Sequence, residues 1–517
     1  MKSKIFQSLS FKLSIFTIFL ISLAFAFFNS NFNTIAQQEP PLPEKINNLI
    51  EQSSLKDAFW SISIRDDQNR LIYDLNSSKL VTPASNLKVV SSAAVLDELG
   101  PDFKFTTKIY TKNQVIQEVA QEAPPEANEG KIEGTLNGDI YLVGYGDPSI
   151  NGMAYGGERL YVFKKLIKQL KDSGITVIEG DLIANDGFFD RKFIPDGWLW
   201  DDLSFYYAAP IGALSFNNNC VDLEVKANGS QGARPKVSWF PFNTNLITVV
   251  NEQVITGKGY GFEESYEREL GTNTIVLRSS MPSGYTEGES ITVKDPTAFF
   301  ADSLKKFMES EGITLKGKVL QEHTFPDFSE ANGFKLLASH ESVPVSELLK
   351  EVNKNSNNFY IEMLLKAAAA HQMQSPGSTK LGILLIENFL KKQEIEASKI
   401  HLKDASGLSP NNLVTTSLLS ELLVKMKKHP HFVVYKKSLS EGGVDGSLGG
   451  RFGKGPLKSK FVGKTGYITG ARALTGYLKT AKNQDLVVSV VTNHFTDKVY
   501  VVDLLHQNIL EAIYASN

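Results

Sequence analysis

The chain has 517 residues, of which 42% are hydrophobic and 21% are charged, and its 54 basic and 57 acidic side chains give a formal net charge of −3. This length is too great for one ordinary domain, so two or three compact units are expected. The near balance of charge argues against nucleic acid as a partner, and the single cysteine, Cys220, excludes an intrachain disulfide.

The N-terminus has the layout of an export signal. Lysines precede an apolar run over residues 13–28, and Thr34 to Ala36 resembles a cleavage site before Gln37. We therefore predict a signal peptide over residues 1–36 and an exported, periplasmic mature chain. An uncleaved membrane anchor is the alternative, since the apolar run approaches spanning length, and it leaves weak membrane association open.

The first half of the mature chain predicts a hairpin, a helix and a long β-rich region. Residues 61–76 alternate apolar and polar side chains around a polar turn, which is typical of a β-hairpin, and a helix is expected over Thr82 to Gly100. From about Thr106, short alternating segments separated by Gly and Asn turns indicate many short strands. An acidic, proline-containing loop over residues 117–130 lies among them.

The second half returns to helical periodicity at residues 296–312 and ends in three strands and a helix. The economical assembly is an α/β (α+β) domain whose five-stranded antiparallel sheet combines the first hairpin with the last three strands and is flanked by helices. Residues 40–100 and 293–517 would form this domain. Residues 101–292 would be a large β-rich insertion made of two subdomains.

Ser85 and Lys88 lie three residues apart near the start of the predicted helix, so their side chains share one face. The positive end of the helix dipole stabilises a developing anion on the serine, and a lysine kept neutral by desolvation can accept the serine proton. The S-x-x-K motif alone is a weak signal, because two other serine–lysine pairs in the chain have the same spacing.

Two further motifs follow in the chain. Lys464, Thr465 and Gly466 form a K-T-G motif inside a predicted strand, which suits binding of a carboxylate-bearing peptide beside the strand, with Gly466 allowing close approach. Ser356 and Asn358 form an S-x-N motif at a predicted junction between two helices, where a loop can present side chains to a cleft.

The ordered set S-x-x-K, S-x-N and K-T-G is typical of penicillin-binding proteins and serine β-lactamases. Along nearly all its mature length the chain resembles the class C, low-molecular-mass penicillin-binding proteins, which are D-alanyl-D-alanine carboxypeptidase/endopeptidases. The similarity extends to four other segments, at residues 142–150, 196–219, 404–412 and 442–452.

The resemblance implies a penicillin-binding-protein transpeptidase-like fold and a serine-type D-Ala-D-Ala peptidase that acts on peptidoglycan stem peptides and cross-links and is inhibited by β-lactams. Ser85 would attack the D-Ala carbonyl and form an acyl-enzyme. Lys88 would accept the Ser85 proton, and Ser356 would relay a proton toward the departing amine.

The remaining assignments concern substrate binding. By the same resemblance, Asn358 would hold the substrate amide and Lys464 with Thr465 the terminal carboxylate. The backbone amides of Ser85 and Tyr467 would form the oxyanion hole.

Two further positions bear on specificity. Asp186 resembles a residue that recognises a free amino group on the stem peptide, with a turn aspartate as the alternative interpretation. Pro410 stands where the family often has arginine, which leaves the side-chain preference open.

Two alternatives remain. A β-lactamase shares the acyl-enzyme chemistry, but the separation of 271 positions from Ser85 to Ser356 exceeds what a compact β-lactamase can hold. A catalytically idle cell-wall-binding module is the second alternative. No cofactor or metal is expected, because His429 and His431 have no frame of further ligands and are interpreted as surface residues.

Overall fold

The structure is a computed structural model that describes residues 40–113, 115–117, 134–241, 244–259, 261 and 265–516. The predicted signal peptide over residues 1–36 and nearly all of the acidic loop over 117–130 lie outside the described residues. Within the described ranges, no helix is both long enough and apolar enough to cross a bilayer.

The main domain is built on an antiparallel sheet, which confirms the predicted fold class. The first hairpin and the last three strands lie side by side in this sheet, as expected from their alternation. The structure adds a sixth strand at the edge, which is only two residues long and therefore too short to show a pattern in the sequence. The strand order is β2 (Leu71–Leu75), β1 (Phe59–Asp66), β23 (Asp485–Asn493), β22 (Ala471–Lys479), β21 (Phe461–Ile468) and β20 (Ser440–Glu441).

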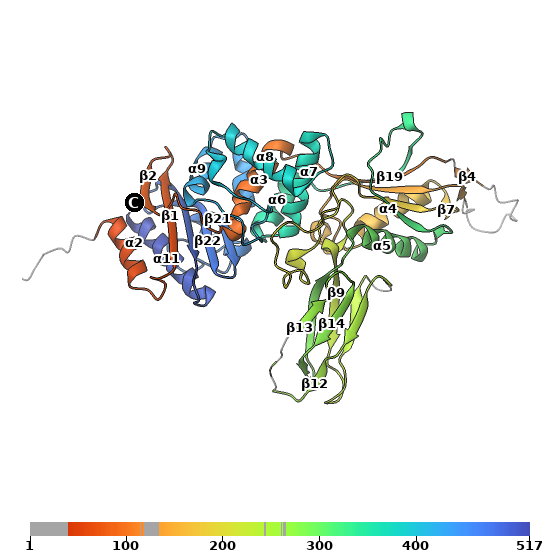
Figure 1. Cartoon of the computed structure of the whole chain (residues 1–517), viewed down its shortest axis with the longest axis horizontal. Helices are drawn as coiled ribbons and strands as arrows, with labels where there is room; N and C mark the ends of the chain where they lie inside the picture. The colour runs from red at the N-terminus through yellow and green to blue at the C-terminus, as the bar shows by residue number, and fades with distance from the viewer. Residues whose placement is uncertain are drawn as a thin grey trace, which may run out of the picture.

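One face of the sheet is covered by two helices, α2 (Leu42–Glu51) and α11 (Val499–Ser516), which pack against each other (Figure 1). Their buried side chains, such as Ile46 and Ile509, form one core with the apolar residues of the strands. The helix α2 lies in the proline-rich start of the mature chain and was not predicted, although proline is well tolerated in a first helical turn.

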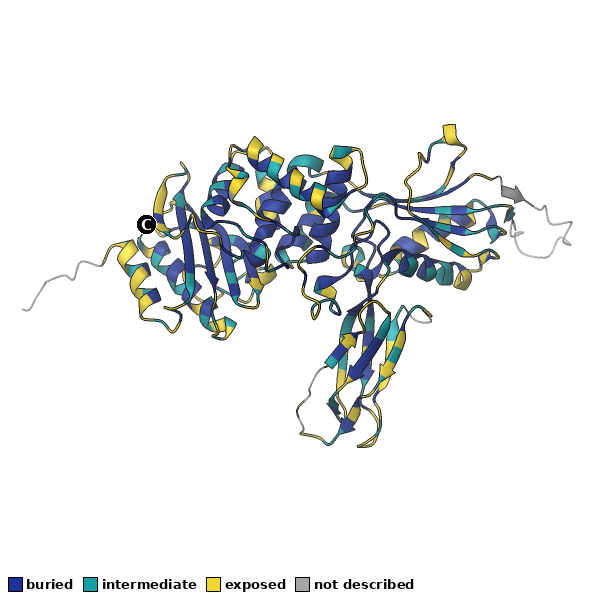
Figure 2. Cartoon of the chain, viewed as in Figure 1, coloured by how far each residue is buried: buried dark blue, intermediate teal, exposed yellow. Residues whose placement is uncertain are grey.

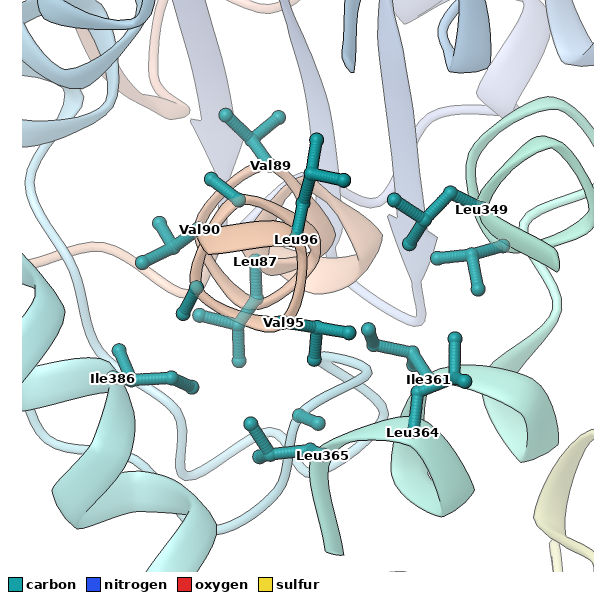
Figure 3. Close-up of a cluster of buried hydrophobic side chains, with 14 of the residues drawn as sticks. Leu87, Val89, Val90, Val95, Leu96, Leu349, Ile361, Leu364, Leu365 and Ile386 are labelled. Atoms are coloured by element: carbon teal, nitrogen blue, oxygen red, sulfur yellow. The ribbon is translucent and has the colours of Figure 1, made fainter. Parts of the chain in front are cut away.

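On the other face, α3 (Lys88–Leu99) is enclosed by helices from later in the chain. Figure 3 shows Val95 and Leu96 of α3 directed toward side chains of the surrounding helices. Because α3 is buried on nearly every side, the turn at its start is held rigidly. The surrounding helices are α6 (Val345–Lys354), α7 (Asn358–Met373), α8 (Thr379–Lys392), α9 (Thr416–Met426) and α10 (Phe432–Ser438).

The insertion contains two units, and the first lies next to the helices of the main domain (Figure 1). It has two sheets, with α4 (Tyr161–Asp172) and α5 (Pro296–Ser310) contributing to its core. The first sheet has the order β18 (Val319–Glu322), β8 (Leu182–Asn185), β6 (Ile140–Gly144), β3 (Thr106–Thr111) and β19 (Lys335–Glu341). The second has the order β17 (Thr314–Leu315), β7 (Ile175–Ile178), β5 (Gly134–Leu136) and β4 (Val115–Gln117).

The insertion therefore continues beyond the boundary expected at residue 292. Strand β18 pairs in parallel with β8, and β19 pairs antiparallel with β3, so both strands complete a sheet that began some 200 residues earlier in the chain. The main domain resumes only at α6. Strand pairing over such a sequence separation leaves no local pattern, which is why the boundary was placed too early.

The second unit of the insertion projects away from the rest of the molecule (Figure 1), and Figure 2 shows buried residues along its interior. Its described residues form two three-stranded sheets and one two-stranded sheet. The strands are β9 (Cys220–Lys226), β10 (Lys236–Phe240), β11 (Thr248–Asn251), β12 (Val254–Thr256), β13 (Ser265–Arg268), β14 (Thr274–Arg278), β15 (Ser280–Pro282) and β16 (Thr286–Thr292).

Candidate active site

Ser85 lies in a 3-10 turn, Ala84–Leu87, that leads directly into α3. The predicted helix over residues 82–100 is thus divided, and Ser85 precedes its α-helical part. Ala84 has a left-handed φ of 47°, and a Cβ atom added at Gly407 would lie only 1.9 Å from the Ala84 carbonyl oxygen. The close backbone contact at Gly407 therefore fixes the turn that carries the serine.

Lys88 is fully buried, and its Nζ atom donates three hydrogen bonds. The acceptors are Ser85 Oγ at 2.9 Å, Asn358 Oδ1 at 2.6 Å and the carbonyl oxygen of Ser406 at 2.9 Å. Burial lowers the pKa of Lys88 to about 7, although the nearby acidic groups oppose this shift. A substantial neutral fraction at neutral pH makes Lys88 competent to accept the Ser85 proton.

Two buried carboxyl groups lie beneath Lys88, and no role was assigned to either from the sequence. Oε1 of Glu362 accepts hydrogen bonds from the backbone amides of Ala405 at 2.9 Å and Ser406 at 2.8 Å. Asp404 accepts hydrogen bonds from the Gly407 and Ser409 amides and from Trp198 Nε1. Burial raises the pKa of both carboxyl groups. Together they fix the loop whose Ser406 carbonyl contacts Lys88.

A second serine–lysine pair stands across the site. Lys464 Nζ, also fully buried, donates hydrogen bonds to Ser356 Oγ at 2.8 Å and to the Thr465 carbonyl oxygen at 2.7 Å. Burial first, and then the positive charges of Lys88 and Arg472, hold the pKa of Lys464 well below its usual value. Ser356 lies between α6 and α7 with a left-handed φ of 59°, at the helix junction expected from the sequence.

The K-T-G strand passes directly beside the nucleophile. A Cβ atom added at Gly466 would lie 2.8 Å from the Pro83 carbonyl oxygen and 3.1 Å from the Ser85 amide nitrogen, so only glycine fits without displacement. Thr465 Oγ1 donates a hydrogen bond to Ser447 Oγ at 2.8 Å. Tyr467 is half-exposed at the rim of the site.

A cleft of about 680 Å³ lies over these groups. One side is formed by the main domain, and the other is formed by residues of the insertion, mainly within 199–218. Ser85, Ser356 and Asn358 contribute to its walls, and Asn358 Nδ2 donates a hydrogen bond to the Tyr207 carbonyl oxygen at 2.8 Å. Tyr467 and Pro410 line the cleft as well. Ser85, Ser356 and Asn358 thus line one cleft, and the buried Lys88 and Lys464 contact the two serines.

Asp186 is not among the residues that line this cleft. It is 2% exposed, accepts a hydrogen bond from Thr297 Oγ1 at 2.6 Å and lies 2.8 Å from His323 Nδ1. The cleft instead contains Asp201 and Asp202, which were not predicted as site residues although they lie in a segment that carries the family resemblance. The sequence that could have identified them is Trp-Leu-Trp-Asp-Asp over residues 198–202, which lies within that segment.

The two histidines considered for metal binding differ in their surroundings. His429 is largely enclosed, with its Nε2 atom 3.0 Å from Asp97 Oδ1, so it is not the surface residue expected. His431 lies nearby but contributes to no cluster of ligands. In the described part of the chain, no group of three or more His, Cys, Asp or Glu side chains is arranged to hold a metal ion.

The sheet-and-helix fold and the two serine–lysine pairs define a serine acyl-transfer enzyme of the penicillin-binding type. Residues 42–503 match the D-Ala-D-Ala carboxypeptidase 3 (S13) family, and the chain therefore belongs to this family of serine peptidases. The resemblance seen in the sequence motifs is confirmed.

Individual relatives agree with this assignment. The chain is 28% identical over 471 residues to a D-alanyl-D-alanine carboxypeptidase of Actinomadura sp. (strain R39), covering 87% of this chain and 81% of the relative. It is 28% identical over 491 residues to the D-alanyl-D-alanine carboxypeptidase DacB of Haemophilus influenzae, covering 92% of both. The crystal structure of penicillin-binding protein 4 (dacB) from Haemophilus influenzae superimposes with a TM-score of 0.75 at 25% identity, covering 91% of this chain and 98% of that one.

Proposed function

We propose that the chain is an exported serine D-Ala-D-Ala carboxypeptidase and endopeptidase that acts on peptidoglycan stem peptides and cross-links and is acylated by β-lactams. The observation that carries the proposal is the contact between Ser85 Oγ and the fully buried Lys88 Nζ at 2.9 Å. This contact joins a nucleophile to a base whose pKa is lowered to about 7, within a family of D-Ala-D-Ala carboxypeptidases.

In the first step, Ser85 Oγ attacks the carbonyl carbon of the penultimate D-alanine while its proton passes to Lys88 Nζ. The backbone amides of Ser85 and Tyr467 stabilise the oxyanion that forms. The peptide C–N bond then breaks, and the departing amine takes a proton through Ser356, which accepts a hydrogen bond from Lys464. Water later cleaves the ester and frees Ser85.

The substrate lies along β21 as an added strand. Strand β20 pairs only with Val462 and Gly463, which leaves the edge of β21 from Lys464 onward available to a peptide. Lys464 and Thr465 bind the terminal carboxylate, because the Lys464 amine and the Thr465 hydroxyl are neighbouring hydrogen-bond donors there. Asn358 holds the amide of the acyl half.

An exported, periplasmic location belongs to the same proposal. It rests on the signal-peptide pattern over residues 1–36, since the substrate lies outside the cytoplasm. Weak membrane association would follow only if this segment were retained.

The proposal is tested by measuring the intact mass of the protein after incubation with benzylpenicillin, with Ser85→Ala as the matched control. A stable adduct equal to the mass of the β-lactam is expected in the wild type and not in the variant, together with release of D-alanine from a pentapeptide. Rapid release of penicilloate would instead favour a β-lactamase. Absence of both an adduct and turnover would favour a non-catalytic binding module.

A further inference from the structure

A second cavity, of about 330 Å³, adjoins the active-site cleft. Met153, Glu351 and Asn355 line both spaces, so the cavity extends the cleft as a groove. One wall of the groove comes from the insertion, at Met153 and Ala154, and the other comes from α6. We call this space the α6 groove.

The α6 groove begins at the end of the cleft where the substrate carboxylate is bound. Lys354 and Asn355, which line it, immediately precede Ser356 in the chain. Gly446 also lines it and is followed by Ser447, which accepts the hydrogen bond from Thr465. The groove therefore starts beside the two groups, Ser356 and Thr465, that face the leaving residue in the proposed function.

The chemistry of the leaving residue shows what a groove in this place can hold. The carboxylate and the side chain of that residue are attached to the same carbon atom, so a side chain must start next to the bound carboxylate. In a carboxypeptidase substrate this side chain is the methyl group of D-alanine, which needs no groove. In a cross-link, the leaving residue is the D-centre of a diamino acid, and its side chain continues into a second peptide.

The walls of the α6 groove suit such a chain. Glu347 and Lys350 form an ion pair at 2.7 Å on one wall, and Lys354 pairs with Asp445. Each ion pair offers hydrogen-bond donors and acceptors to the amides of a bound peptide. Because the charges within each pair cancel, the groove does not favour a peptide of one net charge. Met153 adds an exposed apolar side chain at the entrance.

We infer that the α6 groove binds the second peptide of a cross-link, the part of the leaving group that extends beyond the D-centre. The inference rests on the proposed function and assigns cross-link cleavage, as distinct from removal of terminal D-alanine, to residues outside the catalytic centre. The groove acts by binding, so its contribution appears in kcat/KM for long leaving groups alone.

The test uses two substrates with the same acyl half. In one the leaving residue is D-alanine, and in the other it is the D-centre of a diaminopimelyl residue that carries a tripeptide. Ala154→Trp and Lys350→Trp narrow the groove from opposite walls, and neither residue lines the cleft. Lys168→Trp, at an exposed position of α4 away from both spaces, is the matched control.

We expect both groove variants to lower kcat/KM for the long leaving group by about tenfold or more, the size of effect that a mismatched pocket contact produces. Cleavage of the D-alanine substrate and acylation by benzylpenicillin should remain at the level of the Lys168→Trp control. Equal kcat/KM for the long substrate in the groove variants and the control would overturn the inference. Failure of the wild type to be acylated or to release D-alanine would instead overturn the proposed function.

Discussion

Glu362 of α7 and Lys88 of α3 are linked through a single residue, Ser406. The carboxylate of Glu362 accepts a hydrogen bond from the Ser406 backbone amide at 2.8 Å, and the carbonyl oxygen of the same residue accepts one from Lys88 Nζ at 2.9 Å. A buried acid thus fixes the position of the base without touching the nucleophile. Burial lowers the pKa of Lys88 against the opposing charges of Asp404 and Glu362, while the Ser406 carbonyl fixes the position of its Nζ atom.

The rate of acylation by benzylpenicillin should depend on pH through Lys88. Its pKa of about 7 means that the ammonium form, which cannot accept a proton, dominates at lower pH. The acylation rate is therefore expected to rise with pH, to reach half of its maximum at a pH of about 7, and to level off only well above that pH. Lys88→Arg, which stays protonated throughout, should lose about 10²- to 10⁴-fold in rate. A rate that is constant from acid to alkaline pH would contradict the role of Lys88.

Glu362 should act through the loop that it holds. Glu362→Ala leaves the buried amides of Ala405 and Ser406 without their acceptor, which costs about 1–3 kcal/mol for an unsatisfied group. We expect a lower melting temperature and slower acylation. Glu362→Gln keeps an acceptor oxygen and should fall between the wild type and the alanine variant in both measurements. Equal behaviour of the two variants would show that the amide contacts are unimportant.

Ser356 and Lys464 should behave as one unit. Each single alanine variant removes the 2.8 Å hydrogen bond between them. The second substitution should therefore lower the acylation rate by less than it does in the wild type. A double-mutant cycle on acylation by benzylpenicillin is expected to give a coupling of about 0.5–3 kcal/mol, the range found for residues in direct contact. Additive effects of the two substitutions would argue that the serine and the lysine act independently.

Gly466 should be intolerant of any side chain. The Cβ atom of Gly466→Ala would press on the Pro83 carbonyl and the Ser85 amide, moving β21 away from the nucleophile. A displacement of about 1 Å at reacting groups costs on the order of 10²-fold in rate. Gly450→Ala is the control, because its Cβ atom meets no other atom within 4 Å. If Gly466→Ala were acylated at a near-normal rate, the close packing of β21 against the backbone of Pro83 and Ser85 would not be needed for acylation.

The candidate site residues could be proposed from the sequence because each belongs to a short motif with a fixed spacing. Ser85 and Lys88 have helical spacing, and the K-T-G motif follows strand alternation. Glu362 and Asp404 could not be found in this way, because a buried carboxylate has no local signature and depends on backbone amides supplied by distant parts of the chain. The end of the insertion was misplaced for the same reason, since β18 and β19 pair with strands far earlier in the sequence.

Asp201 should be the acidic group that meets a cationic side chain of the substrate. Asp186 was the candidate from the sequence, but it is buried against Thr297 and His323, whereas Asp201 lines the cleft and is exposed. We therefore expect Asp186→Asn to lower the melting temperature while leaving KM unchanged for a peptide with a free side-chain amine.

Asp201→Asn should instead raise KM for that peptide by about two- to fivefold, because an exposed ion pair contributes up to about 1 kcal/mol. It should leave KM for the same peptide with an acetylated amine unchanged, since acetylation removes the charge that Asp201 would meet. The comparison of the two peptides separates a lost charge contact from a change in the shape of the cleft. If Asp186→Asn alone raised KM for the amine peptide, recognition would have to extend beyond the cleft to the buried carboxylate.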